Sequence, residues 1–263
     1  MKKYFVIGNP IEHSFSPKLH NFWNKLYNIK AEYFKKRLSH NEIEIFIEDL
    51  RQKKIFGANI TVPFKKSVIS YLDKLSAEAE KTQSVNTITL THNKLIGYNT
   101  DIFGFEQAIK ILNFNISGKK IFILGAGGVV PSIIFALNKM RASTIKISNR
   151  TKEKAEKLKD QFYNIDVLNW GEIPEFDLII NATSLGLNNE NINLDFSKVN
   201  KNKLFYDLIY NPNETNFLKE GKKQGNLTEN GKLMFIYQAQ AAFNLWHGIK
   251  PDINKQTLEL LNL

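Results

Sequence analysis

The sequence predicts an α/β protein with two domains, and three observations support this fold class. Short runs rich in β-branched and aromatic residues alternate with longer segments whose apolar residues recur at helical spacing. From residue 119 onward the alternation becomes a regular strand–helix repeat, which is typical of a parallel sheet with crossover helices. The length of 263 residues suits one large domain or two modest ones. We place the first domain at residues 1–103 and the second at 104–230.

The first domain is predicted to begin with a strand over residues 4–8. A helix over 17–27 and a strand over 31–37 follow. A second helix over 41–52 carries a stripe of Ile43, Phe46, Ile47 and Leu50 at helical spacing. The next strand is expected over 57–62 and a further helix over 64–73. In the strand 57–62, Asn59 and Thr61 share one face because side chains alternate.

The second domain is predicted to contain four strands of a parallel sheet, over residues 120–124, 144–148, 176–181 and 204–210. Helices over 128–140 and 151–162 connect the first of these strands. The final segments, 231–246 and 254–263, have helical patterns. Their sequence is compatible with packing on either domain.

Composition excludes several classes of protein. No apolar run approaches the roughly 20 residues of a membrane helix, and the N-terminal apolar stretch is too short for a signal peptide, so no membrane association is expected. The chain has no cysteine, which excludes disulfides and thiolate zinc sites and favours a cytoplasmic location. The five histidines show no ligand spacing, so we expect no metal site.

The net charge of +10 raises the question of nucleic-acid binding. Arginine is the favoured reader of bases and phosphates, yet the chain contains only Arg37, Arg51, Arg141 and Arg150. The many lysines are interleaved with acids along amphipathic segments such as 151–159. We therefore expect a solvated basic surface that attracts a small anionic molecule, and no nucleic-acid partner.

A glycine-rich turn, Gly125-Ala126-Gly127-Gly128, follows the strand 120–124 directly and precedes a helix. Such a turn lets backbone N–H groups approach a pyrophosphate at the helix N-terminus, although Val130 stands where the usual motif has a third small residue. The next strand ends in Asn149-Arg150-Thr151, where NAD-binding folds carry an acid. Arginine with hydroxyl and amide neighbours suits a 2′-phosphate, so the pattern favours NADP. The alternative is that Asn149 and Thr151 only cap the next helix.

Polar residues also cluster in the first domain. Ser16 with Pro17 is explained as a helix N-cap, whereas Ser14 is not needed for capping. The two hydroxyls, two residues apart beside a helix N-terminus, also suit a small carboxylate. Lys65 follows the end of the strand 57–62, where ligands of α/β sheets bind. With Asp101 it would form the acid–base pair that alcohol–ketone chemistry needs. The alternative for Lys65 is an ordinary surface lysine.

The motifs in this order resemble the shikimate dehydrogenase family over nearly the whole chain. They are Gly8-Asn9-Pro10, Ser14-x-Ser16-Pro17-x-x-His20-Asn21, Asn59-Ile60-Thr61-x-Pro63-x-Lys65, Val85-Asn86-Thr87, Asn99-Thr100-Asp101-x-x-Gly104, Gly125-Ala126-Gly127-Gly128, Asn149-Arg150-Thr151, Asn181-Ala182-Thr183-Ser184 and Gln238 ahead of Phe243-x-x-Trp246. The resemblance implies reduction of 3-dehydroshikimate to shikimate with NADPH, in aromatic amino acid biosynthesis. It implies an N-terminal α/β substrate domain that the closing helices 231–263 rejoin, and a Rossmann-like NADP-binding domain.

The resemblance also implies a role for each site residue. Lys65 and Asp101 would be the catalytic pair, and Ser14 and Ser16 would hold the substrate carboxylate. Further substrate contacts would come from Asn59, Thr61, Asn86, Tyr210 and Gln238. Cofactor contacts would come from Gly125, Ala126, Gly127, Gly128, Asn149, Arg150, Thr151 and Thr183.

Val129-Val130-Pro131 and Leu187 depart from the family pattern, away from the reacting atoms. Three alternatives stay open: a quinate/shikimate dehydrogenase that uses NAD or both cofactors, a relative with another cyclic hydroxy acid as substrate, and a dinucleotide-sensing binding protein without turnover. The last would be expected to lack the lysine or the carboxylate. The sequence leaves the chain as a monomer or a homodimer.

Overall fold

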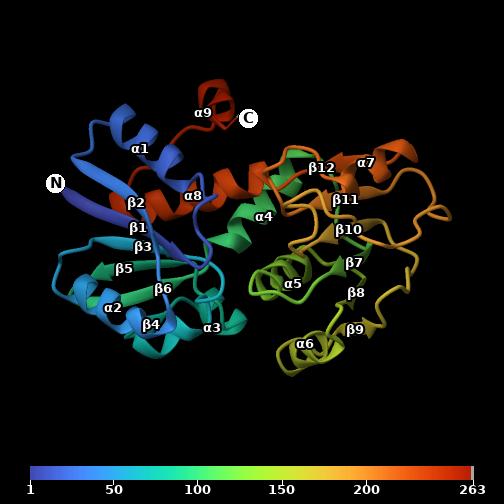
Figure 1. The fold of residues 1–263 in the computed structure, drawn as a ribbon, viewed down its shortest axis with the longest axis horizontal. Coiled ribbons are helices and arrows are strands. Elements are labelled where there is room, and N and C mark those ends of the chain that lie inside the picture. Colours follow the sequence, from blue (N-terminus) through green and yellow to red (C-terminus); the bar gives the residue numbers. More distant parts are fainter. Residues whose placement is uncertain (262–263) are drawn as a thin grey trace. The chain divides into compact units, whose positions relative to one another are not determined.

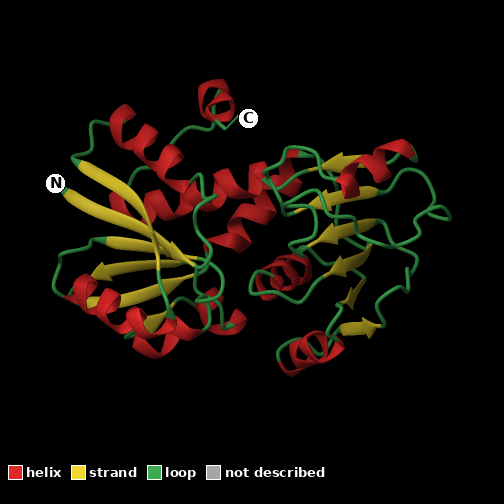
Figure 2. Ribbon diagram, in the orientation of Figure 1, coloured by secondary structure: helices red, strands yellow, loops and turns green. Residues whose placement is uncertain are grey.

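The computed structural model describes residues 1–261, which form two compact units (Figure 1). Unit 1 contains Met1–Gly104 and the described residues from Ile236 onward, and unit 2 contains Phe105–Phe235. The boundary falls inside two helices, α4 (Thr100–Ile111) and α8 (Lys232–His247). Each unit contains its own six-stranded sheet (Figure 2).

The sheet of unit 1 has the strand order β2-β1-β3-β5-β6-β4. Its strands are β1 (Lys2–Gly8), β2 (Ala31–Arg37), β3 (Gly57–Ile60), β4 (Lys74–Leu75), β5 (Thr87–Thr91) and β6 (Lys94–Tyr98). β1 pairs in parallel with both β2 and β3, whereas β5 runs antiparallel to β3 and to β6. The carboxyl ends of β1 and β3 therefore meet at one edge of the sheet, and the residues after β3 lie at that edge.

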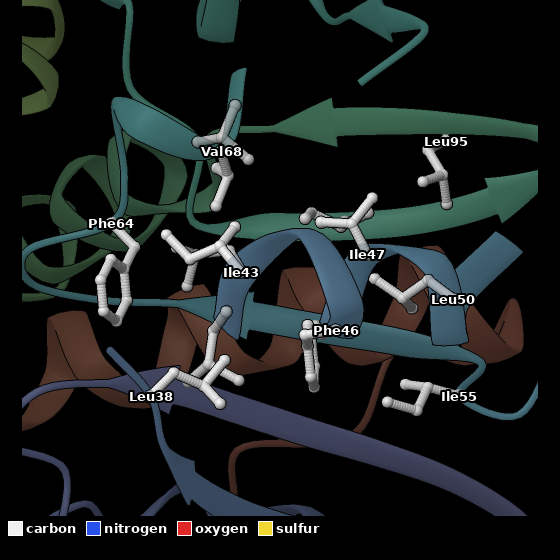
Figure 3. Packing of buried hydrophobic residues seen from close by; sticks show 14 of the residues in the cluster. Leu38, Ile43, Phe46, Ile47, Leu50, Ile55, Phe64, Val68 and Leu95 are labelled. Carbon is white, nitrogen blue, oxygen red and sulfur yellow. The ribbon is translucent and has the colours of Figure 1, made fainter. Parts of the chain in front are cut away.

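Different helices pack against the two faces of this sheet. One face packs against α2 (Ile43–Arg51), whose Ile43, Phe46, Ile47 and Leu50 enter an apolar cluster with the sheet (Figure 3). The same cluster contains Phe64. The predicted helical stripe of α2 is thus confirmed as the buried side of that helix. The remaining short helices of unit 1 are α3 (Ala77–Thr82), α9 (Lys255–Leu260) and the 3₁₀ turns His40–Glu42 and Ser67–Tyr71.

An aromatic cluster covers the other face, between α1 (Ser16–Leu26) and α8. His20 of α1 stacks on Tyr33 of β2, with ring centroids 4.2 Å apart and ring planes 4° apart. Trp23 lies edge-on to Phe243 of α8 at 5.5 Å. Trp246 donates its indole N–H to the Ile88 carbonyl at 3.0 Å. The closing helix α8 is thereby fixed to the unit 1 sheet.

Unit 2 contains a parallel sheet in the order β12-β11-β10-β7-β8-β9. Its elements are β7 (Lys120–Leu124), α5 (Val130–Lys139), β8 (Thr144–Ser148), α6 (Lys152–Glu156), a 3₁₀ helix (Lys157–Asp160), β9 (Ile165–Leu168), β10 (Leu178–Asn181), β11 (Leu204–Asp207), α7 (Asn216–Lys223) and β12 (Leu227–Glu229). The strand order reverses between β7 and β10. Ligands of open α/β sheets bind at such a switch point, beyond the carboxyl ends of the strands.

Several elements differ from the predicted ones. The expected helix 64–73 is a series of turns with the 3₁₀ helix Ser67–Tyr71, where the hydroxyls of Ser67 and Ser70 donate to backbone carbonyls and compete with helical bonding. The helix expected over 151–162 ends as α6 at Glu156 and continues as 3₁₀. The end of the predicted helix 254–263 lies outside the described residues; the described part is α9.

Candidate active site

A buried ion pair lies at the strand edge of unit 1. The Lys65 ammonium donates to Asp101 Oδ2 at 2.5 Å, and the two side chains are only 10% and 8% exposed. Phe64, which is fully buried in the α2 cluster, anchors the turn that carries Lys65, and Val85 N–H donates to the Lys65 carbonyl at 2.9 Å. Asp101 lies in the first turn of α4, where the helix dipole favours a carboxylate. The structure thus brings together two residues that are 36 positions apart in sequence.

Asn86 connects this pair to its surroundings. Its Nδ2 donates to Asp101 Oδ1 at 2.8 Å, and also contacts Thr100 Oγ1 at 2.9 Å and Gln238 Oε1 at 3.5 Å. Its Oδ1 accepts from the Thr100 backbone N–H at 2.7 Å. Four residues singled out from the sequence, Lys65, Asn86, Asp101 and Gln238, therefore form one connected group.

Asn59 is buried behind this group, and its amide is bonded within the protein on both sides. Its Nδ2 donates to the Asn86 carbonyl at 3.1 Å and to Thr87 Oγ1 at 3.0 Å, and its Oδ1 accepts from the Tyr33 hydroxyl at 2.6 Å. Burial raises the pKa of the Tyr33 phenol, which stays protonated and able to donate. Sequence reasoning missed Tyr33, because the partner strands β2 and β3 are separated by β1 and no local pattern links them.

Thr61 directly follows β3 and is half-buried. Its methyl group lies close to Gly8, where an added Cβ would come within 2.5 Å. Gly8 is therefore required for the close approach of the β1 end to the turn after β3.

The two serines at the start of α1 are hydrogen-bonded to each other. Ser14 Oγ donates to Ser16 Oγ at 3.2 Å and accepts from the Ser16 backbone N–H at 3.3 Å. The capping prediction was wrong: Phe15 occupies the N-cap position and Ser16 is the first helical residue. Ser14 supplies the acceptor at this helix start, because its hydroxyl is the one in reach of a first-turn N–H.

In unit 2 the glycine-rich turn lies beyond the end of β7. Gly125 has φ +109°, and an added Cβ would come within 2.7 Å of the Ala182 carbonyl oxygen. Ala126 is half-buried, whereas Gly127 and Gly128 are exposed. The N-cap residue Val129 gives α5 no side-chain cap. Backbone carbonyls bond its first turn instead: the Val130 N–H donates to the Gly127 carbonyl and the Ser132 N–H to the Val129 carbonyl, each at 3.0 Å.

Beyond β8, Arg150 and Thr151 are both exposed, and Arg150 forms no ion pair within the part of the chain that the structure describes. Asn149 donates to the Thr151 carbonyl at 2.7 Å. Thr151 occupies the N-cap position of α6, but its hydroxyl makes no capping bond. The capping alternative therefore leaves the hydroxyl of Thr151 unexplained.

Beyond β10, the Thr183 hydroxyl donates to Asn181 Oδ1 at 2.7 Å and accepts from the Leu185 N–H at 3.1 Å. Tyr210 also belongs to unit 2, and its ring stacks on Phe235 with centroids 4.5 Å apart. Tyr210 thus lies in the same unit as the predicted cofactor residues, whereas the other predicted substrate residues lie in unit 1.

Comparison with known proteins identifies the family. The model of the shikimate dehydrogenase substrate binding domain matches residues 6–88, that of shikimate / quinate 5-dehydrogenase matches 106–214, and that of the shikimate 5′-dehydrogenase C-terminal domain matches 233–255. The chain is 57% identical to the shikimate dehydrogenase (NADP⁺) of Pelagibacter ubique, and the alignment covers 100% of both chains. The chain belongs to the shikimate dehydrogenase family.

Solved structures of this family have the same fold. A shikimate dehydrogenase in complex with NADP⁺ is 34% identical and superimposes with a TM-score of 0.92, over 99% of this chain and 94% of that one. The enzyme of Thermus thermophilus, in complex with NADP(H) and shikimate, is 29% identical with a TM-score of 0.91, over 99% and 98%. The predicted two-domain α/β class is confirmed.

Two further properties concern residues 1–261 alone. No helix among them is both long and apolar enough to cross a membrane. Nowhere in this stretch do three or more histidine, aspartate or glutamate side chains gather in a way that could hold a metal ion.

Proposed function

We propose that this chain is an NADP-dependent oxidoreductase that reversibly reduces 3-dehydroshikimate to shikimate, a step of aromatic amino acid biosynthesis. The observation that carries the proposal is the buried pair of Lys65 and Asp101 at the strand edge of unit 1. Family membership supports it, since relatives with this name include structures that contain NADP(H) and shikimate. A dinucleotide-sensing protein without turnover does not require an acid–base pair.

The acid–base step is assigned to Lys65. When bound, NADPH supplies the hydride that the ketone carbon receives. The Lys65 ammonium donates a proton to the oxygen as negative charge develops there, and the amine regains a proton from solvent. Asp101 holds the ammonium through the 2.5 Å bond, and Asn86 holds Asp101 from its other oxygen. In the oxidation of shikimate the neutral amine accepts the hydroxyl proton.

Substrate recognition is assigned to polar groups of unit 1. Ser14 and Ser16 would bind the carboxylate, because their hydroxyls lie side by side at the start of α1. Thr61 and Gln238 would bind ring hydroxyls. Asn59 and Asn86 are buried and their amides are already bonded within the protein. They would act by positioning their neighbours, Asn59 through Thr87 and Asn86 through Asp101. Tyr210 is proposed to contribute from unit 2.

The residues of unit 2 fit a dinucleotide phosphate. Gly125 has a backbone conformation and a close contact that only glycine tolerates, and the glycine-rich turn leads directly into the N-terminus of α5, whose helix dipole favours an anion. We assign the pyrophosphate to Gly125, Ala126, Gly127 and Gly128. The 2′-phosphate is assigned to Asn149, Arg150 and Thr151, and Thr183 would line the cofactor cleft. Unit 1 is accordingly proposed as the substrate and catalytic domain and unit 2 as the NADP domain.

The test follows NADPH absorbance with shikimate and with quinate, each with NADP and with NAD. We expect turnover with shikimate and NADP above all other combinations. Quinate is included because the family description covers it. Stronger turnover with quinate and NAD would replace the proposal by the quinate/shikimate alternative, and no turnover with any pair would favour the sensing protein. The cytoplasmic location and the monomeric or homodimeric state stay predictions.

A further inference from the structure

Asp207 is a buried carboxylate that the proposed mechanism does not use. It ends β11 and has no exposed surface. Its Oδ1 accepts from Asn181 Nδ2 and from the Ile209 N–H, both at 3.0 Å, and its Oδ2 accepts from the Thr215 hydroxyl at 2.6 Å. These donors are all neutral. Burial raises the pKa of Asp207 to about 6, so the ionised group destabilises the fold at neutral pH.

Asn181 is the neighbour through which Asp207 can act. It ends β10 directly opposite Asp207 in the parallel register, and both are fully buried. Its Oδ1 accepts from the backbone N–H of Thr183 at 3.0 Å and from the Thr183 hydroxyl at 2.7 Å, while its Nδ2 also donates to the Leu185 carbonyl at 3.1 Å. One side-chain amide therefore holds the whole turn 182–185.

The carboxylate decides which way this amide points. An ionised carboxylate only accepts hydrogen bonds, so the NH₂ end of Asn181 must face Asp207 and the oxygen must face Thr183. A flipped amide would place two acceptors together at Asp207 and would leave the two donors of Thr183 without an acceptor. Asp207 therefore selects the one amide orientation that binds the turn.

The turn in question is in contact with the glycine-rich turn. Ala182 N–H donates to the Leu124 carbonyl at 2.8 Å, immediately before Gly125. A Cβ on Gly125 would come within 2.7 Å of the Ala182 oxygen and 3.1 Å of the Thr183 methyl carbon. With spacing this tight, displacement of Ala182 or Thr183 changes the space around Gly125.

We infer that Asp207 is a positioning residue for the dinucleotide, acting through Asn181 to hold the turn 182–185 against Gly125. Asp207 does not touch the cofactor itself. The inference rests on the proposed NADP site of unit 2, and not on the chemistry assigned to Lys65.

The experiment measures NADPH affinity directly, by fluorescence titration of the full chain. Asp207→Ala removes the acceptor and frees the Asn181 amide, and we expect NADPH to bind about tenfold more weakly. Asp207→Asn can still present an oxygen to Asn181 and an NH₂ to the Thr215 hydroxyl, so its affinity should stay within about threefold of the wild type. KM for shikimate should not change in either variant.

Asp177→Ala is the matched control. This carboxylate precedes the same strand β10 at its opposite end, and it accepts from the Lys120 N–H at 2.9 Å and from Lys203 Nζ at 3.3 Å. It also supports the sheet, so a merely structural role predicts weaker NADPH binding in Asp177→Ala as well as in Asp207→Ala. The inference requires unchanged NADPH affinity in the control.

Unchanged affinity in a folded Asp207→Ala variant would overturn the inference. If that variant does not fold, Asn181→Ser decides, because it cuts the connection while Asp207 keeps Ile209 and Thr215: tenfold weaker binding supports the inference and wild-type binding overturns it. A wild-type chain that binds NADPH but does not oxidise shikimate would refute the proposed function alone, and the affinities would still test Asp207.

Discussion

At the residue scale, the first prediction concerns Lys65. Lys65→Ala should lower kcat by about 10²–10⁴-fold, because it removes the proton donor, while NADPH affinity stays intact. The neighbouring Lys66 is exposed, so Lys66→Ala is the control and should keep wild-type activity. Steady-state kinetics and NADPH titration separate the two effects. A kcat within a few-fold of the wild type in Lys65→Ala would show that another group transfers the proton.

Asp101→Asn should lower both kcat and substrate affinity, because the amide holds the ammonium more weakly than the carboxylate does. Since the two residues share one bond, the variant with both substitutions should be little worse than the poorer single variant. Losses that multiply would contradict the coupling.

Arg150 gives the third prediction at this scale. A charge-assisted hydrogen bond contributes about 1.5–3 kcal/mol, so Arg150→Ala should weaken NADP binding by roughly 10- to 150-fold. Binding of NAD, which lacks the 2′-phosphate, serves as the internal control and should be nearly unchanged. Isothermal titration with both cofactors makes the comparison, and equal losses for both would remove the 2′-phosphate role from Arg150.

At the element scale, serine variants at the start of α1 test two roles separately, a contribution to stability and a contribution to substrate binding. Ser14→Ala removes the acceptor for the Ser16 N–H and should cost about 0.5–1 kcal/mol of unfolding free energy. Ser76→Ala is the matched control, since Ser76 caps α3 by accepting from the Ala79 N–H at 3.2 Å. Urea denaturation should show similar losses for the two variants. KM for shikimate should rise in Ser14→Ala and in Ser16→Ala, but not in the control Ser76→Ala. An unchanged KM in both Ser14→Ala and Ser16→Ala would show that the two serines have only a structural role.

The elements that the sequence predicted well are those whose signal is local. The strands of unit 2 are continuous apolar runs because both faces of a parallel sheet are buried.

The hairpin of β5 and β6 was missed: its turn uses His92 and Asn93 at φ 48° and 59°, without the glycine that usually marks such a turn. The helix α7 was missed because it is mostly polar, although Phe217 and Leu218 are buried. Contacts such as Tyr33 with Asn59 depend on strand order, which no short pattern encodes.

The same limit applies to the candidate site. The spacing of residues alone placed Lys65 at the end of a strand, but it gave no firm ground for pairing Lys65 with Asp101. That pairing was predicted from the order of the motifs along the chain, which resembles the family pattern. The error at Ser16 is of another kind, because here a local rule was applied one residue too late. A helix does begin at this point, as the rule predicts, but its N-cap position is Phe15 and Ser16 is already the first helical residue.

At the scale of the whole molecule, the two units contain buried groups whose titration has opposite effects on stability. Burial lowers the pKa of His20 to about 3 and that of His247 to about 4, both in unit 1. In unit 2, burial raises the pKa of Asp207 to about 6 and also raises the pKa of Glu229. The largest of these shifts in each unit belong to His20 and Asp207. In unfolded chains these groups titrate near 6.5 and 3.8. Below pH 6.5, His20 binds a proton in the unfolded chain but stays neutral in the folded protein, so acid destabilises unit 1. Below pH 6 folded Asp207 gains a proton that the unfolded chain does not yet bind, so acid stabilises unit 2.

Between pH 7 and pH 5, the linkage of His20 should therefore cost unit 1 about 2 kcal/mol, to which His247 adds, and the linkage of Asp207 should add about 1 kcal/mol to the stability of unit 2. This pH range lies above the usual pKa values of carboxyl groups. Carboxyl groups whose pKa is lowered in the fold, such as Glu190 with a pKa of about 2, therefore contribute almost nothing to the change in stability between pH 7 and pH 5. Hydrogen exchange, corrected for the intrinsic rate at each pH, should show the change in β3 and in β10 separately. His20→Phe should reduce the loss in unit 1 and leave the part that His247 causes, because the phenyl ring keeps the stacking on Tyr33 without a titrating nitrogen. Asp207→Asn should reduce the gain in unit 2 and leave only the part that Glu229 contributes. Parallel pH responses of the two units in the wild type would contradict the assignment of His20 and Asp207.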